Sequence, residues 1–140
     1  MHLEFSVERG DFTKAGEASS QIKRTLKKLN IPSKVIKKVV VALFEAEVNV
    51  IAHSYGGNIT CIIEPKYIKI TVTDTGPGIP DLKLAMTEGY STATQEIQEL
   101  GYGAGMGLSN IKKNSDDLDI YTEAGDHTEI IMGFKINNEE

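Results

Sequence analysis

The sequence has few of the features that mark secreted and membrane proteins. Its 140 residues include one cysteine, Cys61, so no disulfide can form within the chain, and no Cys/His cluster suggests zinc. The longest apolar run, Val39 to Phe44, is far too short to cross a bilayer, and the first residues hold no run of signal-peptide length. We therefore expect a cytoplasmic protein that does not engage a membrane.

Positive charge is also scarce. The chain has 15 Lys and Arg against 20 Asp and Glu, a net charge of −5, and its only arginines are Arg9 and Arg24. Nucleic-acid backbones and anionic lipid surfaces repel a chain of this sign. We therefore expect no nucleic-acid partner.

The length and patterning indicate one domain over residues 1–140, without linker or repeat. Alternating apolar residues predict strands and a 3.6-residue apolar period predicts helices. The expected strands are about Leu3–Val7, Ile59–Glu64, Tyr67–Thr73, Leu118–Glu123 and Thr128–Ile136. The expected helices are about Lys14–Leu29, Ser33–His53, Asp81–Glu88 and Met106–Ser115, and a long polar loop covers Glu88–Gly105.

This order of elements predicts an α+β fold, a two-layer α/β sandwich with helices on one face of a mixed, mostly antiparallel sheet. The strands come in adjacent pairs rather than alternating with helices, which disfavours a parallel βαβ fold. A dinucleotide-binding role for the glycines before Met106 is disfavoured too, because no strand leads directly into them.

Asp74 ends one predicted strand and begins the string Asp74-Thr75-Gly76-Pro77-Gly78. Its side chain should point toward the core layer, because it shares the strand register of Ile68, Ile70 and Val72. A carboxylate in that position needs a partner, and the exocyclic amine of adenine would serve. The alternative is a turn aspartate that bonds its own backbone.

Four alternating glycines precede a predicted amphipathic helix, in the string Gly101-Tyr102-Gly103-Ala104-Gly105-Met106-Gly107-Leu108. Glycine lets a ligand approach the main chain closely, and a helix N-terminus suits phosphate. Together the two strings predict a nucleotide site, with the base at Asp74 and the phosphates at the second loop.

A third motif lies on the helix expected over Ser33–His53. Glu45, Asn49 and His53 are spaced i, i+4 and i+8, so they share one face beside the apolar stripe. They could activate a hydroxyl, ligate Mg²⁺ and lie near phosphate; the alternative is a solvated polar edge. Glu47 lies about 200° around the helix from Glu45 and is expected to take no part in this cluster.

These three motifs, in this order, resemble the nucleotide-binding boxes of the GHKL ATPase superfamily, which includes gyrase, histidine kinases and anti-sigma-factor serine kinases. In this sequence the boxes read Glu45-x-x-x-Asn49, Asp74-x-Gly76-x-Gly78 and Gly103-Ala104-Gly105-Met106-Gly107-Leu108, with Thr128 at the family's last motif position. The resemblance runs from the first strand to the last and implies the Bergerat ATP-binding fold. The chain looks most like the small serine/threonine kinases of the anti-sigma and stress-switch type.

The resemblance implies ATP and Mg²⁺ as cofactors. Glu45 would act as general base, Asn49 would hold Mg²⁺, Asp74 would bind the adenine amine, and Thr128 would add a contact near the base. The implied cofactor-binding residues are Asn49, His53, Asp74, Gly76, Gly78, Gly103, Gly105, Met106, Gly107, Leu108 and Thr128.

Two positions depart from the family pattern. His127 stands where the family has glycine, and the predicted lid over Glu88–Gly105 has no arginine to meet the γ-phosphate. Lys112, Lys113 or backbone N–H groups of the lid would have to serve instead.

The resemblance implies a kinase that transfers the γ-phosphate of ATP to a Ser or Thr of a small regulatory protein. That partner would be an anti-sigma-factor antagonist (STAS-type) domain or a sigma factor, and a homodimer is left open. Two other functions remain: a non-catalytic, nucleotide-gated regulator that sequesters its partner, and a histidine-kinase-like ATPase domain acting in trans.

Overall fold

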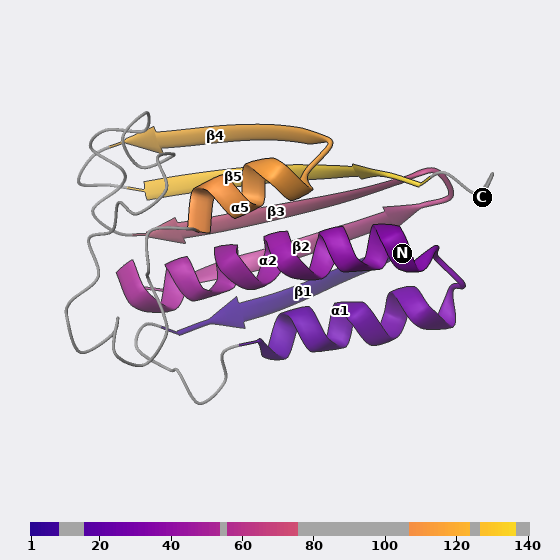
Figure 1. Cartoon of the computed structure of the whole chain (residues 1–140). Helices are drawn as coiled ribbons and strands as arrows, with labels where there is room; N and C mark the ends of the chain where they lie inside the picture. Colours follow the sequence, from indigo (N-terminus) through magenta and orange to yellow (C-terminus); the bar gives the residue numbers. More distant parts are fainter. Residues whose placement is uncertain (9–15, 54–55, 76–106, 124–126, 137–140) are drawn as a thin grey trace.

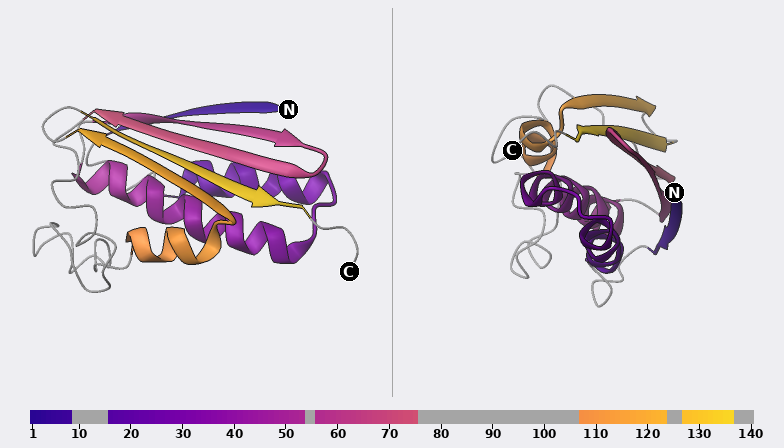
Figure 2. Two further views of the ribbon diagram at one scale, coloured as in Figure 1. Left: turned by 90° about the horizontal axis from the view of Figure 1, so that it is seen from above. Right: turned by 90° about the vertical axis from the view of Figure 1, so that its right-hand side faces the viewer.

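The chain folds into a layer of helices packed on a five-stranded sheet (Figure 1). The computed structural model describes residues 1–8, 16–53, 56–75, 107–123 and 127–136. The strands are β1 (His2–Val7), β2 (Gly57–Glu64), β3 (Tyr67–Thr75), β4 (Asp117–Glu123) and β5 (His127–Lys135). The helices α1 (Glu17–Lys28), α2 (Ser33–His53) and α5 (Gly107–Asn114) lie on one face of the sheet, as the end-on view in Figure 2 shows.

The strand order in the sheet is β1-β2-β3-β5-β4, and every neighbouring pair is antiparallel. The predicted α+β sandwich with helices on one face is therefore confirmed, and its sheet is antiparallel throughout the described strands. The final hairpin folds back so that β5 lies between β3 and β4. That insertion brings the start of β5 beside the end of β3, where Asp74 lies.

α2 is the central helix of its layer, with α1 on one side and α5 on the other (Figure 2). Its apolar stripe is buried as predicted, through Val35, Val39, Ala42, Leu43, Ala46 and Val50. α1 adds Ile22 and Leu26, both fully buried. Between these two helices Asn30 takes a φ of 57°, the left-handed conformation that lets the chain reverse after a helix.

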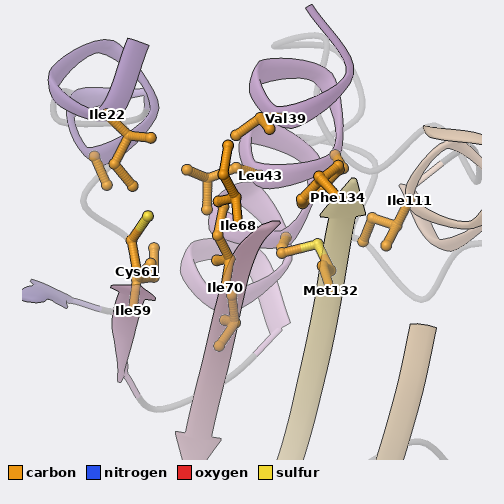
Figure 3. Packing of buried hydrophobic residues seen from close by; sticks show 14 of the residues in the cluster. Ile22, Val39, Leu43, Ile59, Cys61, Ile68, Ile70, Ile111, Met132 and Phe134 are labelled. Carbon is orange, nitrogen blue, oxygen red and sulfur yellow. The ribbon is translucent and has the colours of Figure 1, made fainter. Parts of the chain in front are cut away.

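The core lies between the two layers (Figure 3). Ile22 and Leu43 from the helices and Ile70 and Met132 from the strands belong to one buried cluster. Cys61 on β2 is part of it, and desolvation by burial raises the pKa of its thiol to about 12. A thiol with so high a pKa is a packing group rather than a nucleophile.

Tyr67 and Asp117 form a tightly packed polar contact on the face of the sheet opposite the helices. Tyr67 on β3 reaches across β5 and donates its hydroxyl to Asp117 Oδ2 at 2.9 Å. The ring passes over Gly133, where a Cβ atom would overlap the Tyr67 hydroxyl. Partial burial of the phenol, together with the hydrogen bond and the charge of Asp117, raises the pKa of Tyr67 to about 12.

The predicted helices and strands agree with the structure to within two residues at their ends, apart from the start of α1 at Glu17. The helix predicted over Asp81–Glu88 and the loop predicted over Glu88–Gly105 lie outside the described residues.

Candidate active site

Predicted site residues are carried by four helices and strands, and the relevant ends of these four elements lie on the same side of the molecule. The C-terminal ends of α2 and β3, the start of β5 and the start of α5 lie together in the views of Figures 1 and 2. α2 packs against α5, β3 and β5, so these ends are held by the core rather than by loops. The described residues of three motifs that are far apart in the sequence are thereby carried by elements that end on the same side of the molecule.

Asp74 and Thr128 are direct partners across β3 and β5. Ile68, Ile70 and Val72 are buried at 1% exposure or less, so the predicted strand register holds. Asp74, next in that register, is half-buried, and Thr128 is buried on the same side of the sheet. A carboxylate and a hydroxyl side by side at the end of a buried strand can accept and donate hydrogen bonds to the edge of a planar base.

Glu45 and Asn49 lie one turn apart on α2, and both are half-buried. Ala46 and Val50, the residues that follow each of them, are fully buried core residues. The two polar side chains therefore border the core, as the helical spacing predicted. Asn110 on α5 donates from Nδ2 to Glu45 Oε1 at 3.3 Å, which joins the two helices at this point.

Glu47 has a structural role that the sequence pattern did not indicate. Its side chain is 2% exposed and accepts hydrogen bonds from Ala18 N at 3.3 Å, Ser19 N at 3.3 Å and Ser19 Oγ at 2.9 Å. These donors belong to the first turn of α1, whose N-cap residue Gly16 has no side chain to offer. Glu47 takes no part in the Glu45 face, as predicted, but it caps the neighbouring helix instead.

α5 begins at Gly107, the last glycine of the second string. Leu108 and Ile111 anchor this eight-residue helix in the core. Its N-terminal N–H groups and the positive end of its dipole lie on the same side of the molecule as the end of β3, which carries Asp74, and can meet a phosphate. Lys112 and Lys113 are exposed in its last turn, and Lys112 follows Gly107 by about 8 Å along the axis.

The remaining predicted residues are described in part or not at all. His53 is the last residue of α2, and Leu108 is a buried core residue of α5. Five predicted residues lie outside the described ones: Gly76, Gly78, Gly103, Gly105 and Met106. Of the predicted set, the structure pairs Asp74 with Thr128 and puts Glu45 and Asn49 on one half-buried helix face.

The side chains described above are chemically suited to bind a nucleotide together with Mg²⁺. Mg²⁺ prefers oxygen ligands and is commonly held by one or two protein groups, phosphates and water. The amide oxygen of Asn49 is such a group. The described residues contain no cluster of three or more His, Cys, Asp or Glu that could hold a metal by itself. Among the same residues, no helix is long and apolar enough to cross a membrane.

The chain is similar to known proteins in sequence and in fold. The family described as histidine kinase-like ATPase domain matches residues 10–134. The chain is 38% identical over 65 residues to the serine/threonine-protein kinase RsbT of Bacillus subtilis, which covers 46% of this chain and 43% of RsbT. It is 35% identical over 111 residues to an anti-sigma F factor of Clostridium novyi, which covers 75% of this chain and 74% of that protein.

A solved structure shares the fold. The RsbU and RsbW domains of a Mycobacterium tuberculosis protein match with a TM-score of 0.65 at 14% identity, over 97% of this chain and 32% of that one. The matched region spans less than half the length of RsbT and about three quarters of the anti-sigma F factor.

Proposed function

This chain belongs to the histidine kinase-like ATPase domain family, and from that membership we propose that it is an ATP-dependent protein serine/threonine kinase. It would transfer the γ-phosphate of ATP to a Ser or Thr of a small regulatory protein. The superfamily inferred from the three motifs is confirmed by the match over residues 10–134. Support for the kinase activity comes from the relative named as a serine/threonine-protein kinase.

One observation carries the proposal: Glu45 and Asn49 are half-buried on one face of the C-terminal half of α2, and α2 ends on the same side of the molecule as β3, where Asp74 pairs with Thr128. In the proposed complex Asp74 accepts from the adenine amine, and Thr128 lies beside it. Asn49 ligates Mg²⁺, which neutralises charge on the phosphates and orients them. Glu45 receives the proton of the substrate hydroxyl as general base.

The glycine strings and His53 complete the proposed site. Gly76, Gly78, Gly103, Gly105 and Gly107 would let the nucleotide approach the main chain. Met106, Leu108 and His53 would flank it. With no arginine beyond Arg9 and Arg24, contact with the γ-phosphate would fall to backbone N–H groups at the start of α5, since Lys112 and Lys113 lie in its last turn.

The partner is a small regulatory protein, since relatives of this chain are named for sigma-factor control. Within that class, the proposed substrate is a STAS-type antagonist domain, and a sigma factor is the second candidate. We place the protein in the cytoplasm as a single ATP-binding domain over residues 1–140, able to form a homodimer. The scarcity of arginine favours one alternative, a nucleotide-gated regulator that binds its partner without phosphorylating it.

Capture of partners on immobilised protein with Mg·ATP, followed by phosphosite mapping, tests the activity. The expected result is a phosphorylated Ser or Thr on a captured protein, lost when Glu45→Gln replaces the wild type. Capture without any phosphorylation would support the non-catalytic regulator. Phosphohistidine on the captured protein would support a histidine-kinase-like domain acting in trans.

A further inference from the structure

Glu45 is held by a side chain that none of the three motifs assigns. Asn110 Nδ2 donates to Glu45 Oε1 at 3.3 Å, across 65 residues of sequence. We propose that Asn110 is a positioning residue, which orients the Glu45 carboxylate for proton transfer. The inference rests on the proposed function, because it assigns Asn110 a role in the same phosphoryl transfer.

The direction of this hydrogen bond fits a general base. An ionised carboxylate can only accept hydrogen bonds, so the amide must present its NH₂ group to Glu45. Glu45 Oε1 is thereby assigned to Asn110. Glu45 Oε2 is the oxygen left to take the substrate proton.

The bond can persist through the proposed reaction. The substrate hydroxyl oxygen forms a bond to the γ-phosphorus while the bond from that phosphorus to the ADP oxygen breaks, and the hydroxyl proton passes to Glu45 Oε2. Oε1 can still accept from Asn110 in the protonated acid. The carboxylate is therefore held in one orientation before and after proton transfer, without rearrangement at the moment of reaction.

Asn110 is itself held rigidly. Its neighbour Ile111 is fully buried, and α5 packs along α2. The carbonyl of Asn110 accepts from Asn114 Nδ2 at 2.8 Å, and the carbonyl of Ile111 accepts from Ser115 Oγ at 2.7 Å. A glutamate side chain has several rotatable bonds, and a fixed donor reduces the conformations that it samples.

The position of Asn110 also connects the proposed general base, Glu45, with the loop predicted to bind phosphate. It lies three residues after Gly107, in the first turn of the helix that begins at that loop. α5 is short and packed in the core, so the N–H groups proposed to meet phosphate and the amide that holds Glu45 belong to one rigid unit. A single helix thereby fixes the proposed phosphate-binding N–H groups relative to the donor that orients Glu45.

The test is a double-mutant cycle between Asn110→Leu and Glu45→Gln. The kinetic constants are measured with radiolabelled ATP and the protein captured by the wild type. Asn110→Leu removes the donor at similar size, and misplacing a catalytic group can cost about 10²-fold, so kcat should fall roughly 10- to 100-fold with little change in KM for ATP. In the Glu45→Gln background the same substitution should change kcat no further, since the base is already absent.

Two further variants separate positioning from a structural effect. Asn110→Asp has the same shape but sets a second carboxylate against Glu45, and it should lower kcat at least as much as Asn110→Leu. Asn114→Leu, one turn later on α5, removes the bond to the Asn110 carbonyl but keeps the Asn110 amide, so it should lower kcat much less than Asn110→Leu while reporting any loss of helix stability.

The outcomes separate the inference from the proposed function. Wild-type rates in Asn110→Leu, or losses that multiply with those of Glu45→Gln, would overturn the positioning role while Glu45 keeps its assignment. If Glu45→Gln itself transfers phosphate at the wild-type rate, Glu45 is not the base, and the role of Asn110 is refuted with it. A rise in KM for ATP with kcat unchanged would make Asn110 a binding residue instead.

Discussion

Glu47 on α2 holds Ser19 on α1 through two hydrogen bonds, from the backbone N–H at 3.3 Å and from the hydroxyl at 2.9 Å. A third bond comes from Ala18 N. The N-terminus of α1 is thus capped by a side chain from the neighbouring helix and not by its own flanking residue. This contact fixes α1 to the helix that carries Glu45 and Asn49, so the stability of the fold and the geometry of the proposed site share one element.

Replacing Glu47 should destabilise the protein. Glu47→Ala leaves the N–H groups of Ala18 and Ser19 buried without acceptors, which costs about 1–3 kcal/mol in unfolding free energy. Glu47→Gln should cost less, because one oxygen remains to accept. Urea denaturation measures both values. Glu64→Gln, an exposed glutamate at the end of β2, is the control and should change little; equal stability of Glu47→Ala and this control would contradict the capping role.

Tyr67 should ionise well above the usual pH for tyrosine. Its pKa is raised to about 12 in the folded state against an ordinary 10.0. The neutral phenol is therefore favoured by folding, so its contribution to stability is complete below pH 10 and is lost as the pH rises toward 12. Ultraviolet titration of tyrosinate in the wild type minus that in Tyr67→Phe isolates this group among the five tyrosines.

Asp117→Asn provides the second arm of this titration. It removes the negative charge beside the phenol, so the Tyr67 pKa should move down toward its ordinary value. A difference titration centred near 10 in the wild type would show that Asp117 does not hold Tyr67 in solution.

The parts of the fold set by local periodicity could be predicted from the sequence. The alternation Ile68, Ile70, Val72, Asp74 predicted which way Asp74 points, and the apolar stripe of α2 predicted which faces of that helix are buried. Both follow from geometry within one element. The pairing of Asp74 with Thr128 depends instead on β5 lying between β3 and β4, and Thr128 was placed by resemblance alone.

The two contacts that the sequence did not indicate join separate helices. Glu47 follows Leu43 by four residues and precedes Val50 by three, so a charged residue at a core position was a readable signal that it needs buried partners. Which partners it finds depends on how α1 packs against α2, 28 residues away in sequence. The bond between Asn110 and Glu45 depends on the rotation of two packed helices, and no local pattern of residues reports that rotation.

Asp74→Asn should weaken binding of adenine nucleotides. The substitution keeps the shape but replaces one acceptor oxygen by an NH₂ group, which would face the adenine amine. An unpaired donor in a buried contact costs about 1–3 kcal/mol, or roughly 5- to 150-fold in Kd. Calorimetric titration with ATP measures the change. Asp119→Asn, an exposed aspartate on β4, is the matched control; the same Kd in both variants would remove Asp74 from the site.

Asn49→Ala should abolish most of the benefit that Mg²⁺ gives to ATP binding. The amide oxygen is the one protein ligand proposed for the ion, whose other ligands would be phosphate oxygens and water. Affinity for ATP measured in the presence of a chelator should change little, because adenine recognition at Asp74 is separate. The quantity to compare is the ratio of Kd without Mg²⁺ to Kd with Mg²⁺, obtained by calorimetry for each variant. Asn58→Ala, whose exposed amide on β2 accepts from Ser6 Oγ, is the matched control and should keep the wild-type ratio. A wild-type ratio in Asn49→Ala would show that the ion is held without this residue, and the proposed arrangement of α2 around the phosphates would have to be abandoned.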